Sequence, residues 1–247
     1  MTDIGNTEAP AWELFAADVV RALEKVGNRC LTLPSGTGLW STKGVAARIA
    51  LRANEHLGAT LNLLSIDAIT ASRTLARGLL ECAFASAALT TEPDVFLRML
   101  KDDSERSRHN QGNFILERGL GDDKLQLQKL RVAISAMDRK LELISPKKVA
   151  LLGPLAAQYL QYQRLSDDSA HLTARSLEHY VARETAGWRA IPCEPSAEQN
   201  LATLQLALQS SLLTAFAVCE VLEFSLERTE VGGLLERLAS MPQTRMI

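Results

Sequence analysis

Three charged residues stand four positions apart in an Ala- and Leu-rich segment of this 247-residue chain: Arg73, Arg77 and Glu81. On a helix, a spacing of four places side chains on one face. Charges are rarely left unpaired among apolar side chains, so this face needs partners. One interpretation is a structural ion pair between Arg77 and Glu81 that fixes how the helices pack. The other is an anion site, in which the arginines face a cleft and Glu81 orients them.

A second group of polar residues lies in the run from Tyr162 to His171. On a helix, Arg164 and His171 share a face and lie about 10 Å apart along the axis, while Ser166 and Asp167 can cap or kink the segment. An arginine fork binds phosphate, and a histidine transfers protons near neutral pH. Facing one cavity, the pair could remove the 2′-hydroxyl proton of RNA so that this oxygen attacks the neighbouring phosphorus without a metal. Alternatively, His171 donates to a backbone carbonyl and Arg164 lies on a solvated face.

The chain lacks the motifs of the common nucleotide, metal and hydrolase sites. It has no Walker loop, no G-x-G-x-x-G, no H-E-x-x-H and no G-x-S-x-G. Its four cysteines and four histidines are scattered without zinc-like spacing. A metal site would have to combine Asp, Glu and His side chains from different helices. We therefore predict no metal and no cofactor.

The helical repeat of apolar side chains predicts which elements position these residues. The predicted helices span residues 11–26, 43–65, 67–90, 93–118, 122–144, 147–173 with a break at Gly153-Pro154, and 196–228, before a short amphipathic piece at 231–240. Asp67, and either Asp122 or Asp123, are expected to cap the helices that follow them. Between 176 and 192 the pattern changes, and a short β-hairpin is expected there.

These elements predict an all-α fold, a single antiparallel bundle of about six to seven helices with that one hairpin. The core is expected in residues 43–228, with the helix at 11–26 and the tail at 229–247 as extensions. Hydrophobic residues make up 47% of the chain, which is enough to build a core and excludes a disordered protein. The run from Leu206 to Cys219 is shorter than the roughly 20 residues of a membrane span, so it indicates a buried core helix.

The charge balance limits the partners that the chain can have. The formal net charge is −2, from 27 Lys and Arg against 29 Asp and Glu. Broad electrostatic binding of nucleic acid is therefore excluded, and RNA or a nucleotide would have to bind at one local site. The polar, acidic N-terminus lacks the pattern of a signal peptide. We expect a cytoplasmic protein with reduced cysteines and no membrane association.

The two polar segments together resemble a known family. Their order and spacing are similar to those of uncharacterised bacterial proteins of HEPN-like fold (higher eukaryote and prokaryote nucleotide-binding). The matching positions are Arg73, Arg77 and Glu81 and then, after a charged helix, Tyr162, Arg164, Leu165, Ser166 and His171. The resemblance covers roughly residues 43–225. It implies an all-α bundle that is often dimeric.

Catalytic HEPN proteins carry an Arg and a His separated by four to six residues, and they act as metal-independent ribonucleases at a dimer interface. Arg164 and His171, with six residues between them, fit the upper limit of this spacing. The residue after the arginine is usually polar in the active ribonucleases, whereas here it is Leu165. The family also includes non-catalytic binding modules, so the fold alone does not decide the function.

Three hypotheses account for these residues. The first is a metal-independent RNA endonuclease of toxin or defence type, in which Arg164 holds phosphate and His171 acts as acid and base. The second is a non-catalytic helical module that binds a protein partner or a nucleotide through the same polar cleft. The third is a purely structural polar network in an oligomer, and a homodimer is the expected state. The residues expected to line the cleft are Arg73, Arg77, Glu81, Ser166 and Asp167.

Overall fold

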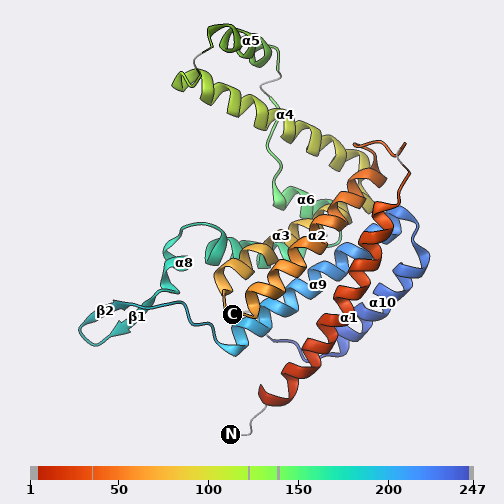
Figure 1. Cartoon of the computed structure of the whole chain (residues 1–247), viewed down its shortest axis with the longest axis vertical. Coiled ribbons are helices and arrows are strands. Elements are labelled where there is room, and N and C mark those ends of the chain that lie inside the picture. The colour runs from red at the N-terminus through yellow and green to blue at the C-terminus, as the bar shows by residue number, and fades with distance from the viewer. Residues whose placement is uncertain (1–4, 35, 122, 138–139, 245–247) are drawn as a thin grey trace.

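The computed structural model of the chain describes residues 5–34, 36–121, 123–137 and 140–244. Of the described residues, 76% are helical, and these residues include one small antiparallel sheet of two strands, in agreement with the predicted all-α class. Several helices lie side by side and form the body of the molecule (Figure 1). These helices are α1 (Gly5–Leu31), α2 (Thr42–Leu64), α3 (Ile69–Thr91), α9 (Ala197–Leu222) and α10 (Ser225–Ser240).

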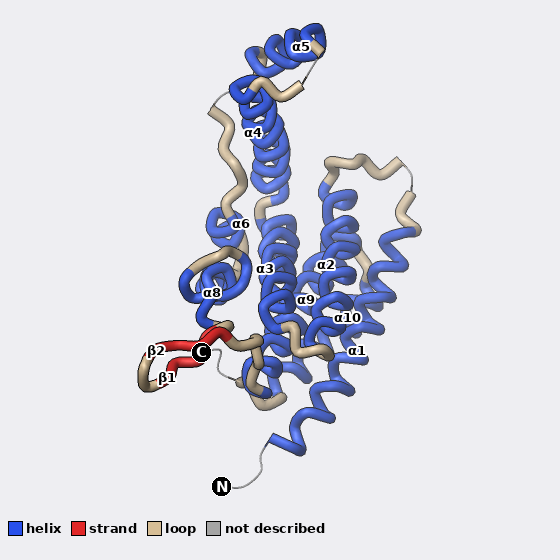
Figure 2. The backbone as a smooth tube through the Cα atoms, turned by 60° about the vertical axis from the view of Figure 1, so that its left-hand side comes forward, coloured by secondary structure: helices blue, strands red, loops and turns tan. Residues whose placement is uncertain are grey.

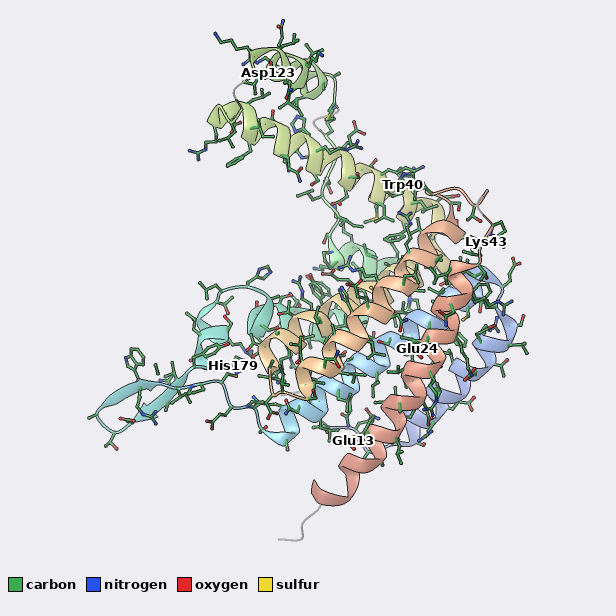
Figure 3. The ribbon with its side chains drawn as sticks, viewed as in Figure 1. Glu13, Glu24, Trp40, Lys43, Asp123 and His179 are labelled. Atoms are coloured by element: carbon green, nitrogen blue, oxygen red, sulfur yellow. The ribbon has the colours of Figure 1, made fainter. Side chains whose placement is uncertain are left out.

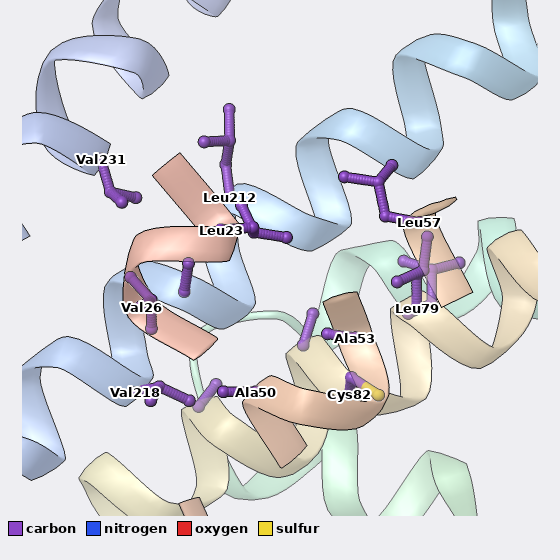
Figure 4. Packing of buried hydrophobic residues seen from close by; sticks show 14 of the residues in the cluster. Leu23, Val26, Ala50, Ala53, Leu57, Leu79, Cys82, Leu212, Val218 and Val231 are labelled. Carbon is purple, nitrogen blue, oxygen red and sulfur yellow. The ribbon is translucent and has the colours of Figure 1, made fainter. Parts of the chain in front are cut away.

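Helix α9 lies in the middle of this body and packs against α1, α2, α3 and α10. Leu212 and Val218 of α9 point into the core beside side chains of α1, α2 and α3 (Figure 4). Helix α1 contributes the fully buried Trp12 and Phe15 to the same core. By length and composition α9 could cross a membrane, but 67% of its most apolar stretch is buried within the protein. The predicted buried helix over 206–219 is therefore confirmed.

Two helices project from the body as an arm. Helix α4 (Pro93–Arg118) extends away from α3, and α5 (Lys124–Ser135) folds back against its far end (Figures 1 and 2). Pro93 occupies the first turn of α4, and Gly119 ends it in the left-handed region, at φ 61°. The Asp123 carboxylate caps α5 by accepting from two backbone N–H groups, at 2.8 and 3.2 Å. Asp122 lies outside the described residues.

The segment between 146 and 190 consists of short elements packed along α3 or extending from it. The elements in order are α6 (Pro146–Leu152), η1 (Ala156–Gln158), α7 (Tyr159–Leu165), the π-helical turn η2 (Ser166–Ala170), α8 (Ala174–Glu178), β1 (Val181–Glu184) and β2 (Gly187–Ala190). The break at Gly153-Pro154 and the hairpin within 176–192 are confirmed. In the hairpin Arg183 pairs with Trp188, and the two strands extend away from the helices (Figure 2).

The predicted fifth helix is too long. Helix α5 ends at Ser135, and residues 140–145 form an extended segment that returns along α4. The backbone N–H of Ile144 donates to the Asp103 carboxylate at 2.7 Å, and the Ile144 side chain packs against the core. A contact with a distant part of the chain therefore replaces the helical hydrogen bonds here. Asp138 and Arg139, also within the predicted helix, lie outside the described residues.

Two other helix boundaries also differ from the prediction. The last long helix breaks at Glu223, which is left-handed at φ 60°, so that Phe224 is buried and α10 folds back on α9. A Glu at this position gives no break signal in the sequence, unlike a Gly. Asp67 does not cap α3, because its backbone is left-handed at φ 56° and its carboxylate accepts from Asn200 of α9, at 2.7 Å.

Candidate functional site

Helix α3 presents its charged face to α7 and η2. Its opposite face buries small and apolar side chains, including Ala76, Leu79 and Ala83, against α2 and α9. The helical repeat that buries this apolar face leaves Arg73, Arg77 and Glu81 on the other one. All three are partly buried, because the later segment of the chain packs across them. The predicted common face is confirmed, and its charges divide into two clusters.

The first cluster, here the closed cluster, consists of Arg73, Asp168, His179 and Thr203, with the exposed Arg175 at its edge, 3.7 Å from the Asp168 carboxylate. Arg73 forms a close ion pair with Asp168, whose other oxygen lies 3.0 Å from Nε2 of His179. The Arg73 Nε also donates to Thr203 of α9 at 3.3 Å. The side chains of Arg73 and Asp168 are only 14% and 11% exposed. Because each charge is paired in a largely buried place, the closed cluster is a structural contact.

The closed cluster ties the hairpin segment to the helical body. His179 follows α8 directly and lies between the hairpin and the helices (Figure 3). Asp168 lies in η2, and its carboxylate reaches both His179 and Arg73. The Thr74 hydroxyl also bonds the Ser169 carbonyl, at 3.3 Å. Loss of Asp168 would therefore leave Arg73 unpaired and release one anchor of the hairpin.

The second cluster, here the open cluster, consists of Arg52, Arg77, Glu81, Tyr162 and Ser166. The Tyr162 hydroxyl donates to Glu81 at 3.1 Å. Glu81 also lies 3.6 Å from Arg77 and 3.7 Å from Arg52, which comes from α2. The Arg77 guanidinium lies over the Tyr162 ring, 5.3 Å from its centroid. One carboxylate thus serves two arginines, and the open cluster carries a net positive charge.

Arg77 is held less tightly than Arg73. It donates to Ser166 at 3.4 Å and meets Glu81 at 3.6 Å, both beyond the usual length of a charge-assisted hydrogen bond. Its Nε atom is buried and has no hydrogen-bond partner among the described residues. The predicted pair between Arg77 and Glu81 is present, but it leaves much of the donor capacity of Arg77 unused.

Two ionisable groups have pKa values shifted by their surroundings, one beside the open cluster and one within it. Burial and then the charge of Arg52 lower the pKa of His56 below its ordinary 6.5, so the imidazole is neutral at pH 7. The His56 ring lies against Gly78 of α3, where an added Cβ would come within 2.6 Å of Nδ1. Burial and the Glu81 charge raise the pKa of Tyr162, so its phenol stays a hydrogen-bond donor.

Arg164, Asp167 and His171 are exposed. Arg164 is in the last turn of α7, whereas His171 follows η2 in extended backbone, at φ −122° and ψ 151°. The seven-residue spacing therefore does not place the two on one helical face, because the π-helical turn changes the phase and the helix ends at Ala170. Asp167 accepts from the Thr173 hydroxyl through its backbone carbonyl.

Sequence reasoning missed Asp168, His179 and Arg52. Asp168 stands three residues after the buried Leu165, so helical spacing could have indicated that it faces inward. His179 and Arg52 gave no such signal, because their partners lie 11 and 29 residues away along the chain. Within the described part of the chain, no group of three or more His, Cys, Asp and Glu side chains could hold a metal ion.

Comparison of the chain with protein-family models, curated proteins and solved structures found no match.

Proposed function

We propose that the protein is a helical binding module of HEPN-like type that holds the phosphate of an RNA or a nucleotide at its open cluster. The observation that carries this proposal is the loosely held Arg77, whose contacts with Ser166 and Glu81 are 3.4 and 3.6 Å long. A phosphate oxygen accepts strongly from guanidinium groups and would offer Arg77 the short bonds that Ser166 and Glu81 do not. Arg52, at 57% exposure, would reach the same anion from α2.

The aromatic residues of α7 suit a nucleotide better than inorganic phosphate. Tyr159 stacks on Tyr162 with the ring centroids 5.7 Å apart, and Tyr159 is partly exposed. Bases of single-stranded nucleic acid stack on such rings, with little dependence on sequence. The net charge of the whole chain is slightly negative, so binding would depend on this local cluster.

A second candidate function is the metal-independent ribonuclease. Two observations favour it. Arg164 and His171, which flank η2, are both exposed, and Ser166 at the start of η2 contacts Arg77. An RNA phosphate bound at the open cluster would lie next to this turn. In this candidate a homodimer would bring the His171 residues of two copies together, and His171 would transfer the proton.

One experiment tests both functions. Binding of a short fluorescent RNA and of adenosine diphosphate is measured by fluorescence anisotropy and calorimetry in EDTA, and RNA cleavage is followed on gels. The variants are Arg77→Gln, His171→Ala and, as a matched control, Arg131→Gln on the distant α5. Loss of a charge-assisted bond weakens binding by about tenfold to 100-fold, so Arg77→Gln should show that loss and Arg131→Gln should not.

The outcomes separate the two candidates. Binding that Arg77→Gln weakens, without cleavage, supports the module. EDTA-resistant cleavage that His171→Ala abolishes supports the ribonuclease. Absence of binding, or equal binding by wild type and Arg77→Gln, overturns the assignment of the open cluster.

A further inference from the structure

A cavity of about 530 Å³ lies on the other side of Glu81 from Arg77, between α2, α3, α4 and α6. Its size is typical of small-molecule sites. Most of its lining is apolar and includes Val45, Phe84, Phe96, Leu100, Ile144 and Val149. Figure 3 labels Trp40, which borders the cavity from the loop before α2. An apolar group bound there would remove this apolar lining from water, so such a group is favoured.

The cavity has its charged groups at the mouth. Arg48 and Arg52, one turn apart on α2, are exposed, and Glu81 is the acidic residue of the lining. The lining therefore carries one net positive charge. Burial raises the pKa of Cys82, also in the lining, to about 11, so this thiol stays protonated and adds apolar surface.

Arg48 is positioned by neutral groups. Its Nε donates to the Gly44 carbonyl at 3.1 Å, Nη2 donates to the Leu39 carbonyl, and the guanidinium lies 5.2 Å from the centroid of the Trp40 ring. No carboxylate of the described residues forms an ion pair with Arg48. Its charge is therefore uncompensated, and its Nη1 end remains available to a ligand.

We propose that this cavity binds a long-chain carboxylate, with the chain between α2, α3 and α4 and the carboxylate on Arg48 at the mouth. The apolar interior and the charged rim match the two ends of such a molecule. A carboxylate carries one negative charge, which equals the net positive charge of the lining, and it accepts the forked donors of a guanidinium. The cavity shares Arg52 and Glu81 with the open cluster, but the carboxylate is held by Arg48, which is outside that cluster, and Arg77 does not line the cavity.

Calorimetry with octanoate, decanoate and dodecanoate, below their micelle concentrations, tests the proposal. Each added methylene that is buried should tighten binding by up to about fourfold. Dodecanol, with the same chain and no charge, should bind at least about tenfold more weakly than dodecanoate. Arg48→Gln should remove this preference for the acid, and Ala85→Phe, which fills the cavity, should weaken both ligands.

Two control measurements test whether the carboxylate site and the open cluster bind their ligands separately. Arg77→Gln should bind dodecanoate as the wild type does, while Arg48→Gln should leave RNA binding unchanged. Thermal unfolding of each variant shows whether it folds. The proposal is overturned if none of the three carboxylates binds saturably. It is also overturned if a folded Arg48→Gln variant keeps the full preference for dodecanoate over dodecanol, or if dodecyl phosphate binds more tightly than dodecanoate.

Discussion

Arg73 and Arg77 are one helical turn apart on the same face of α3, yet their surroundings differ. Arg73 meets Asp168 directly and is held by Thr203 as well, so its guanidinium is occupied. Arg77 shares Glu81 with Arg52 and Tyr162, and its contacts are long. The same residue type is therefore structural at one position and available at the next. The difference comes from which side chain of the 159–170 segment lies opposite each arginine.

The pH dependence of stability should report on His56. Its pKa is lowered in the folded protein by burial and by Arg52, with Glu55 and Glu81 opposing. Between pH 6.5 and the lower pKa of the folded state, the unfolded chain binds a proton at His56 more readily than the folded protein does. The free energy of unfolding therefore decreases as the pH falls through this range. The His56→Gln variant should lose less stability than the wild type between pH 7 and 5, by urea unfolding. A proton titration of His56 by NMR with a midpoint at or above 6.5 would contradict this.

At the scale of elements, α5 is held to α4 by very few contacts. Ile134 is the one residue of α5 that is buried among those described, at 5% exposure. It occupies a notch over Gly112 of α4, where an added Cβ would come within 2.3 Å of the Ile134 Cδ1 atom. Of the other large apolar side chains of α5, Leu125 and Val132 are exposed, and Leu127 and Leu130 are half-buried. A helix with one anchor opens readily.

Gly112→Val should detach α5 without unfolding the body, because it fills the notch that Ile134 occupies. Hydrogen exchange of the amides at 124–135 should approach that of an unstructured chain, whereas α3 and α9 should keep their protection. Gly58→Ala is the matched control, since its Cβ meets nothing within 4 Å and alanine favours a helix by roughly 1 kcal/mol. Unchanged exchange in α5 of Gly112→Val would mean that other contacts hold it.

At the scale of the whole molecule, α9 links the helices of the body. It packs against α1, α2, α3 and α10, whereas the arm of α4 and α5 and the hairpin make few contacts with it. Leu212 is fully buried in α9, and Leu226 at the start of α10 is 81% exposed. Stability should therefore be concentrated in the body around α9.

Leu212→Ala should lower the free energy of unfolding by about 2–5 kcal/mol, the usual cost of a cavity in a close-packed core. The chemically identical change Leu226→Ala should alter it by less than about 0.5 kcal/mol. Urea denaturation followed by circular dichroism measures both. Equal effects of the two substitutions would show that α9 is not the centre of the core.

Local periodicity was enough to predict most of the elements. The buried helix over 206–219, the break at Gly153-Pro154, the hairpin and the common face of Arg73, Arg77 and Glu81 depend on interactions within a few residues, which the sequence displays directly. The boundaries that failed, at Ser135 and Glu223, are set by contacts with Asp103 and with the core.

Only the tertiary structure decided how the charges are divided. The chain itself determined that α3 carries two arginines and a glutamate on one face. It could not show that Asp168 neutralises Arg73 or that Arg52 shares Glu81, because these partners come from other elements. The π-helical turn also separated Arg164 from His171. Hydrogen bonds to distant groups override local periodicity at these places, since an unpaired buried charge costs more than a distorted helical turn.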